Sequence, residues 1–310
     1  MDMHIPRALL KVAEEASQYE HAGNRLDFFC SGQLSACYDA DQLAVWLRLR
    51  PTPRPSFNPE LLRDLNTYCR LLRETSARID FHGEERPVEY AVLASATPRV
   101  FNLGGDLALF MRLIETRDRD ALAVYGKACV DVLYSNYIGH GLPILTISLV
   151  QGECLGGGFE AALSSDLIVA ERSSRFGFPE ILFNLFPGMG AYSFLERRVG
   201  RKAADDLISS GKIYSADDML RAGVVDCVAD DGGGELEIAA LIRRNQRCRN
   251  GLAGIARARR RVSGINLQEL MDVVAIWVET ALNLKPRDLK LMQRLVSRQN
   301  EAGGEAGLLH

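Results

Sequence analysis

The stretch from Val150 to Gly190 constrains the fold more than any other part of the chain. An apolar run over 144–150 predicts a strand, and it leads into three consecutive glycines at 156–158. A short helical pattern follows, and a second apolar run over 167–170 predicts another strand. Glycine has no Cβ, so the backbone can turn sharply there and approach a ligand closely. Strands that alternate with helices in this way predict an α/β fold.

Two glutamates accompany this turn. Glu160 falls in the first turn of the predicted helix, and Glu180 lies in a second apolar segment, FGFPEILF. Apolar surroundings keep a carboxyl group protonated to higher pH, so a pair of them can divide acid and base roles. A glycine run alone is often only a tight turn, and a glutamate in a first helical turn is often only a dipole partner. Their coincidence favours an active site.

The chain resembles the crotonase (enoyl-CoA hydratase/isomerase) superfamily in several segments. These are VFNLGGDL (100–107), VQGECLGGGFEAALSSDLIVA (150–170), FGFPEILFNLFPGMGAYSFLERRVG (176–200) and SGKIYSADDMLRAGVVDCV (210–228). The resemblance implies the crotonase fold, an α/β architecture of repeated ββα units with a spiral core. It also implies chemistry that needs no metal or redox cofactor.

The resemblance assigns roles to individual residues. Leu103 and Gly157 are expected to supply the two N–H donors of an oxyanion hole. Gly104 and Gly156 are expected to contact the substrate. The acid and base fall on Glu160 and Glu180. We expect Glu180 to act as the base toward C2 and Glu160 as the acid toward C3, and the opposite assignment stays open. Retention of both acids favours hydratase or dehydratase chemistry.

A narrower resemblance is to the diffusible signal factor synthases. It rests on FNLGGDL, on the long N-terminal extension and on the pattern around Trp277; Asn102 and Leu103 replace the small residues usual before the glycine. It implies dehydration of a 3-hydroxyacyl thioester of acyl carrier protein, followed by thioester hydrolysis that releases a cis-2-unsaturated fatty acid signal. One alternative is an ordinary enoyl-CoA hydratase acting on CoA thioesters. An alternative of another class is a binding partner of a signalling receptor or sensor protein.

Composition excludes several other classes. The chain has 310 residues and a formal net charge of -3, which gives no reason to expect nucleic-acid binding. The seven cysteines are dispersed, which favours reduced thiols over a disulfide framework or a zinc site. We find no signal-peptide pattern and no membrane-length apolar run, so the sequence predicts a cytoplasmic protein away from the membrane.

The first hundred residues predict alternating elements. A short amphipathic helix is expected over 5–20, and strands are expected over 26–29 and 44–49. Residues 50–60 contain four prolines and predict a surface loop, with a polyproline docking site as the sharper alternative. A helix with its leucines on one face follows, and 90–95 predicts a buried strand.

The rest of the chain divides in two. Residues 107–138 predict helix with a charged break at 117–120, and the glycine-rich 230–235 predicts a linker. We therefore expect a core over 1–229, with its N-terminal helical extension, and a helical region over 230–310. In that region, Asn266 is a candidate N-cap and Pro286 a candidate helix start.

The C-terminal helices are expected to cover the acyl pocket and to build contacts of a homotrimer, as the resemblance implies. The acyl tail is expected among Met189, Trp277 and Leu295, with ordinary core packing as the alternative. The basic run ARARRRV (256–262) predicts a solvated face; the alternative is a contact for an acidic carrier protein or partner domain.

Overall fold

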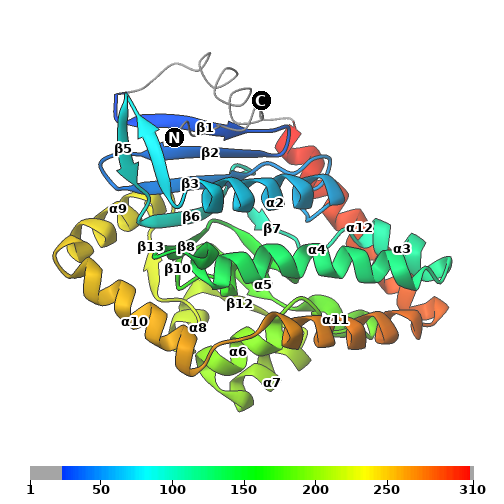
Figure 1. The fold of residues 1–310 in the computed structure, drawn as a ribbon. Helices are drawn as coiled ribbons and strands as arrows, with labels where there is room; N and C mark the ends of the chain where they lie inside the picture. The colour runs from blue at the N-terminus through cyan, green and yellow to red at the C-terminus, as the bar shows by residue number, and fades with distance from the viewer. Residues whose placement is uncertain (1–22, 308–310) are drawn as a thin grey trace.

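A computed structural model describes residues 23–307, without the side chains of residue 298 and of 301–307. Two larger β-sheets, a two-stranded hairpin and the surrounding helices form an α/β architecture (Figure 1). The helix predicted over 5–20 lies outside the described residues. Among the residues described, no helix has the length and apolarity needed to cross a membrane.

The larger sheet has seven strands in the order β1-β2-β3-β6-β8-β10-β13. The first three pair antiparallel, and β3, β6, β8, β10 and β13 pair parallel. Their bounds are β1 Arg25–Cys30, β2 Leu34–Asp39, β3 Ala44–Leu49, β6 Tyr90–Ser95, β8 Leu145–Val150, β10 Leu167–Glu171 and β13 Cys227–Ala229. Every residue of β8 is buried, as expected for a central parallel strand covered on both faces.

Alternation along β3 shows how the two faces of this sheet are filled. Val45 and Leu47 join one apolar cluster, whereas Trp46 joins another. The first cluster contains the apolar faces of α2 (Pro59–Glu74), α4 (Arg119–Tyr137) and α5 (Gly157–Leu163). The second contains residues of α9 (Gly234–Asn245) and α10 (Arg249–Val262). Because side chains alternate along a strand, the sheet separates two helical layers.

A smaller sheet runs beside the first in the order β12-β11-β9-β7. Its strands are β7 Val100–Asn102, β9 Glu153–Leu155, β11 Arg175–Gly177 and β12 Ile213–Ser215. The pairs β6/β7, β8/β9 and β10/β11 each give one strand to the large sheet and the next to the small one, and a helix follows. This is the repeated ββα unit that the family resemblance implied. A separate hairpin joins β4 (Arg78–Phe81) to β5 (Glu84–Pro87).

The remaining helices surround these sheets. They are α3 Leu107–Glu115, α6 Ala191–Val199, α7 Arg201–Ser209, α8 Ala216–Arg221, α11 Leu267–Leu282 and α12 Pro286–Gly307, with short 3-10 turns η1 Gly139–Gly141, η2 Pro179–Phe183 and η3 Gln246–Cys248. Helix α11 packs on α4, and α12 packs on α3 and η2 (Figure 1).

Most of the predicted elements are confirmed. The strands over 44–49 and 90–95 match β3 and β6, and the charged break predicted over 117–120 covers the end of the α3–α4 connection and the first two residues of α4. The Asn266 side chain accepts from the Glu269 N–H at 2.8 Å, so it caps α11 as predicted, and Pro286 opens α12. The prediction missed β2, the β4–β5 hairpin and the three-residue strands of the small sheet. The expected division near residue 230 stays a prediction.

Candidate active site

The glycine turn lets three backbone segments meet. Gly156 has a φ of 52°, which joins β9 to α5. A Cβ added to Gly158 would lie 2.1 Å from the Asn102 carbonyl oxygen, and one on Gly104 would lie 2.8 Å from the Gly157 nitrogen. Only glycine permits so close an approach. The Gly157 nitrogen, at the start of α5, therefore lies beside the 103–105 segment, where an oxyanion hole is predicted.

Glu160 is held in a buried site by backbone donors. Its side chain is 1% exposed, and its Oε1 accepts from the N–H of Met189 at 2.7 Å and of Ala191 at 2.9 Å. Burial raises the pKa of Glu160 to about 7, and the Ala191 and Met189 donors act in the opposite direction. Because those donors stabilise the carboxylate form, Glu160 is suited to be ionised in the resting site.

Glu180 has a different environment. It lies on η2, and a Cβ added to Gly156 would lie 2.5 Å from its Oε1, so its carboxyl group reaches the glycine turn. Its Oε2 is buried without a hydrogen-bond partner in the described structure. Burial, and then the nearby Glu160 carboxylate, raise the pKa of Glu180 to about 8. Glu180 is therefore the member of the pair suited to hold a proton.

Two N–H groups of the segment 103–105 already donate to acceptors within the protein. The Leu103 N–H, the second predicted oxyanion donor, donates to the Pro55 carbonyl at 2.8 Å. The Gly104 N–H donates to Asn102 Oδ1 at 2.8 Å. The donor role of Leu103 stays a prediction, and it requires the Pro55 carbonyl to be displaced from this N–H when substrate binds.

The predicted acyl-pocket residues are buried or half-buried near the same segment. The Trp277 ring packs on Phe110 with centroids 5.0 Å apart, and a Cβ on Gly188 would lie 2.3 Å from Trp277 Cγ. A Cβ added to Gly105 would in turn lie 2.5 Å from the Phe110 ring. Packed aromatic side chains therefore connect α11 with the predicted oxyanion segment.

Two of the three predicted pocket residues make further contacts. Met189 is buried, and it contacts Glu160 through its backbone N–H. Leu295 is half-buried on α12 and packs against the main apolar cluster. The role of these side chains and of Trp277 in binding an acyl tail stays a prediction.

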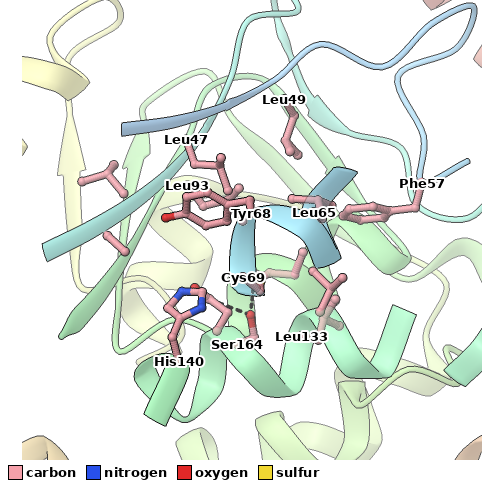
Figure 2. A pocket seen from close by; sticks show the side chains of 15 residues that line it. Leu47, Leu49, Phe57, Leu65, Tyr68, Cys69, Leu93, Leu133, His140 and Ser164 are labelled. Atoms are coloured by element: carbon pink, nitrogen blue, oxygen red, sulfur yellow. Dashed lines mark hydrogen bonds between the residues drawn. The ribbon is translucent and has the colours of Figure 1, made fainter. Parts of the chain in front are cut away.

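A small cavity, whose lining includes neither Glu160 nor Glu180, is shown in Figure 2. Its volume is about 30 Å³, and its lining is mostly apolar, with Ala161 and Ser164 from α5. Two buried polar atoms in this lining, Tyr68 Oη and His140 Nδ1, have no partner within the described structure. The volume suits one or two water molecules and not an acyl chain. None of the predicted site residues lines this cavity.

The basic run is only partly a solvated face. Arg260 pairs with Asp166 at 2.5 Å, and both side chains are largely buried. It lines a cleft of about 330 Å³ together with Arg197, Arg198 and Arg259. Arg197 binds Glu269 at 2.8 Å, and Arg198 pairs with Asp226. The solvated-face prediction is therefore wrong for Arg260, because a helix on the sheet turns one of its basic residues inward.

Several contributors could not be assigned from the sequence motifs. The Ala191 N–H binds Glu160, the Pro55 carbonyl binds Leu103, and Gln299 on α12 binds the same segment. The only signal was indirect, since Pro55 falls in the proline-rich loop and Gln299 interrupts an apolar helical stripe. Among the side chains that the structure describes, no group of three or more from His, Cys, Asp or Glu is placed to hold a metal ion.

Sequence comparison finds a family match over most of the chain. The family model described as enoyl-CoA hydratase/isomerase matches residues 50–253. The fatty acid oxidation complex subunit alpha of Pseudomonas savastanoi pv. phaseolicola is 33% identical over 178 residues, 57% of this chain and 24% of that protein. The probable enoyl-CoA hydratase echA8 of Mycobacterium leprae is 34% identical over 145 residues, 46% of this chain and 52% of that protein. The chain therefore spans about a quarter and about half of the length of these relatives.

Solved structures show the same fold. An enoyl-CoA hydratase/isomerase from Xanthobacter autotrophicus Py2 gives a TM-score of 0.69, covering 88% of this chain and 96% of that chain at 21% identity. The human mitochondrial delta3-delta2-enoyl-CoA isomerase gives 0.70, covering 87% and 98% at 19% identity. At these identities the likeness concerns the fold alone, and it confirms the predicted crotonase architecture.

Proposed function

Because the chain belongs to the enoyl-CoA hydratase/isomerase family, we propose that it moves water across the C2–C3 bond of a fatty acyl thioester. The observation that carries this proposal is the unequal environment of two neighbouring carboxyl groups. Glu160 accepts two N–H donors, and Glu180 has an unpartnered oxygen beside the glycine turn. Groups whose surroundings favour opposite protonation states are suited to act as base and acid.

The chemistry follows from this pair. In hydration, the Glu160 carboxylate removes a proton from water as its oxygen bonds to C3, and Glu180 gives its proton to C2. The thioester oxygen, which gains negative charge, accepts from the Gly157 N–H and from a second N–H of segment 103–105. In dehydration every step reverses: Glu180 removes the C2 proton and Glu160 protonates the departing hydroxyl group. The resting protonation described above is the starting state for hydration.

The finer proposal follows the resemblance to diffusible signal factor synthases. The substrate is then a 3-hydroxyacyl thioester of acyl carrier protein, which is dehydrated to a cis-2-enoyl thioester. A second water, activated by one of the carboxylates, attacks the thioester carbon and releases the free acid and the carrier thiol. The segment FNLGGDL and the buried Trp277 beside Phe110 support this reading. The exposed Arg257, Arg259 and Arg261 of α10 offer positive charge to an acidic carrier.

One assay compares the coarser and finer proposals. The purified protein is supplied separately with a trans-2-enoyl-CoA, a 3-hydroxyacyl-CoA and a 3-hydroxyacyl carrier protein, and the products are identified by mass spectrometry. Free cis-2-enoic acid from the carrier substrate supports the finer proposal. Conversion between enoyl-CoA and 3-hydroxyacyl-CoA alone supports only the coarser one. No turnover of any of the three contradicts both, provided that the protein is folded.

The binding-partner alternative has its own control. A variant with Glu160→Gln and Glu180→Gln keeps the surface while removing both proton-transfer groups. If this variant still binds a signalling receptor as the unmodified chain does, the binding role is independent of turnover. The homotrimer implied by the resemblance is checked by measuring the mass of the assembly in solution.

A further inference from the structure

A glutamine on the C-terminal helix contacts the predicted oxyanion segment. Gln299 is 4% exposed, and its Nε2 donates to the carbonyl oxygens of Leu103 at 3.1 Å and Gly105 at 3.2 Å. We propose that Gln299 is a positioning residue, which fixes the 103–105 backbone so that this segment can present an N–H group to the thioester oxygen. This inference rests on the proposed function, since it concerns the same site.

The segment needs such external contacts. Two of its three residues are glycines, and Gly104 has a φ of 89°, so side-chain packing cannot set the peptide orientations. Hydrogen bonds do so instead: the Gly104 carbonyl accepts from the Phe57 N–H at 2.8 Å. Gln299 donates to the carbonyl groups of the two flanking residues, Leu103 and Gly105. Rotation of either held peptide would break a hydrogen bond to a buried group, which is costly.

The position of Gln299 on α12 is unusual for a polar residue. Met292 and Val296 are buried on the same helix, and the spacing 292, 296, 299 places Gln299 on their apolar face. Its Oε1 is buried without a partner among the described residues. Both facing groups are carbonyl acceptors, so the amide must turn its NH₂ toward them. A half-satisfied buried amide is retained at a cost in stability, which favours a role beyond packing.

The next residue ties the same helix to the far end of the segment. Asn300 Oδ1 accepts from Arg54 Nη1 at 3.2 Å, and Arg54 Nη2 pairs with Asp106 Oδ1 at 2.9 Å. Asp106 follows the segment directly and caps α3 through the Leu109 N–H. Helix α12 therefore contacts the segment directly through Gln299. It also reaches Asp106, the residue after the segment, through Asn300 and Arg54. This arrangement restrains the backbone of the segment, while the Pro55 carbonyl must still leave the Leu103 N–H before that group can donate to a substrate.

The test replaces the Gln299 side-chain amide by an apolar group of similar size. Gln299→Met removes both donors, and Gln293→Met on the exposed face of α12 is the matched control. An oxyanion donor acts mainly in the transition state, so kcat for hydration should fall by roughly 10- to 100-fold with KM changed by less than about threefold. The amides of 104–106 should also exchange hydrogen faster in the substrate-free variant. Gln293→Met should leave both readouts unchanged.

Several results would overturn the inference. These are a kcat within about twofold of the unmodified enzyme, a loss confined to KM, or an equal loss in Gln293→Met. If Gln299→Met does not fold, Gln299→Asn, whose shorter amide cannot reach both carbonyls, is judged by the same criteria. If the unmodified chain turns over no acyl thioester, the proposed function fails, and hydrogen exchange of 104–106 alone decides whether Gln299 holds the segment.

Discussion

The two carboxylate-bearing segments of the site differ in how they hold their acids. Helix α5 presents Glu160 to two N–H groups from the start of α6 and the residues before it, so this carboxylate is stabilised by fixed donors. The 3-10 turn η2 presents Glu180 to the glycine turn with one oxygen unpartnered. Burial raises the pKa of both groups; the Ala191 and Met189 donors then lower that of Glu160, whereas the Glu160 charge raises that of Glu180 further. Two residues of one type can therefore take different roles in one site.

The largest expected effect comes from removing either acid. Glu160→Gln and Glu180→Gln keep the size of the side chain but cannot exchange a proton. Each should lower the rate of hydration and of dehydration by on the order of 10² to 10⁴. The double variant should be little worse than either single one, because groups that act as a unit are not additive. Steady-state assays of folded variants measure this.

A single variant that retains the full rate would contradict the two-carboxylate mechanism. If one variant loses only the release of free acid, that glutamate serves thioester hydrolysis alone. Circular dichroism of each variant provides the folding control.

The second prediction concerns the contact between the two segments. Gly156→Ala adds a Cβ 2.5 Å from Glu180 Oε1, at a φ of 52° that disfavours alanine. Glu180 must then move, and a shift of about 1 Å at a reacting group can cost roughly 10²-fold in rate. Gly254→Ala is the control, because a Cβ there meets nothing within 4 Å on helix α10. Equal activity of the two variants would show that the glycine turn does not set the position of Glu180.

The third prediction uses the pH dependence of hydration. The reaction needs Glu160 ionised and Glu180 protonated, and their pKa values are raised to about 7 and about 8. A plot of kcat/KM against pH should therefore be bell-shaped, falling below about 7 and above about 8, by about tenfold per pH unit at its limits. Residual activity of Glu160→Gln should lack the acid limb, and that of Glu180→Gln the alkaline limb. The reverse pattern would exchange the two roles.

The smallest effect is on stability. The pKa of Glu180 is raised from 4.5 to about 8 by burial and by Glu160, so its charged form is disfavoured in the folded protein. Below pH 4.5 the group is protonated in both states and costs nothing; as pH rises toward 8, the unfolded state loses its proton first and stability falls. Glu180→Gln should therefore unfold at least about 3 °C higher than the unmodified chain at pH 9, and the gain should vanish near pH 4. An equal gain at both pH values would assign it to packing.

Local sequence was sufficient for much of the fold. Helical spacing of apolar residues located α2, α3 and α4, and short apolar runs located β3 and β6, because these elements are long enough for such patterns to appear. Asn266 and Pro286 located helix starts by their own backbone chemistry. The glycine run and the two glutamates could also be identified from the sequence, because a sharp turn and a glutamate among apolar residues both depend on neighbouring residues alone.

Only the tertiary structure decided how these parts are held. Strands β7, β9 and β11 have three residues each, too few to show a period, and they exist because a neighbouring strand pairs with them. The donors to Glu160 lie 29 and 31 residues away, and Gln299 lies 196 residues from Leu103. Which distant group reaches a given acceptor depends on how the chain closes around the core. The sequence therefore predicted which groups would do the chemistry, whereas long-range packing determined their hydrogen-bond partners and with them the shifts of their pKa values.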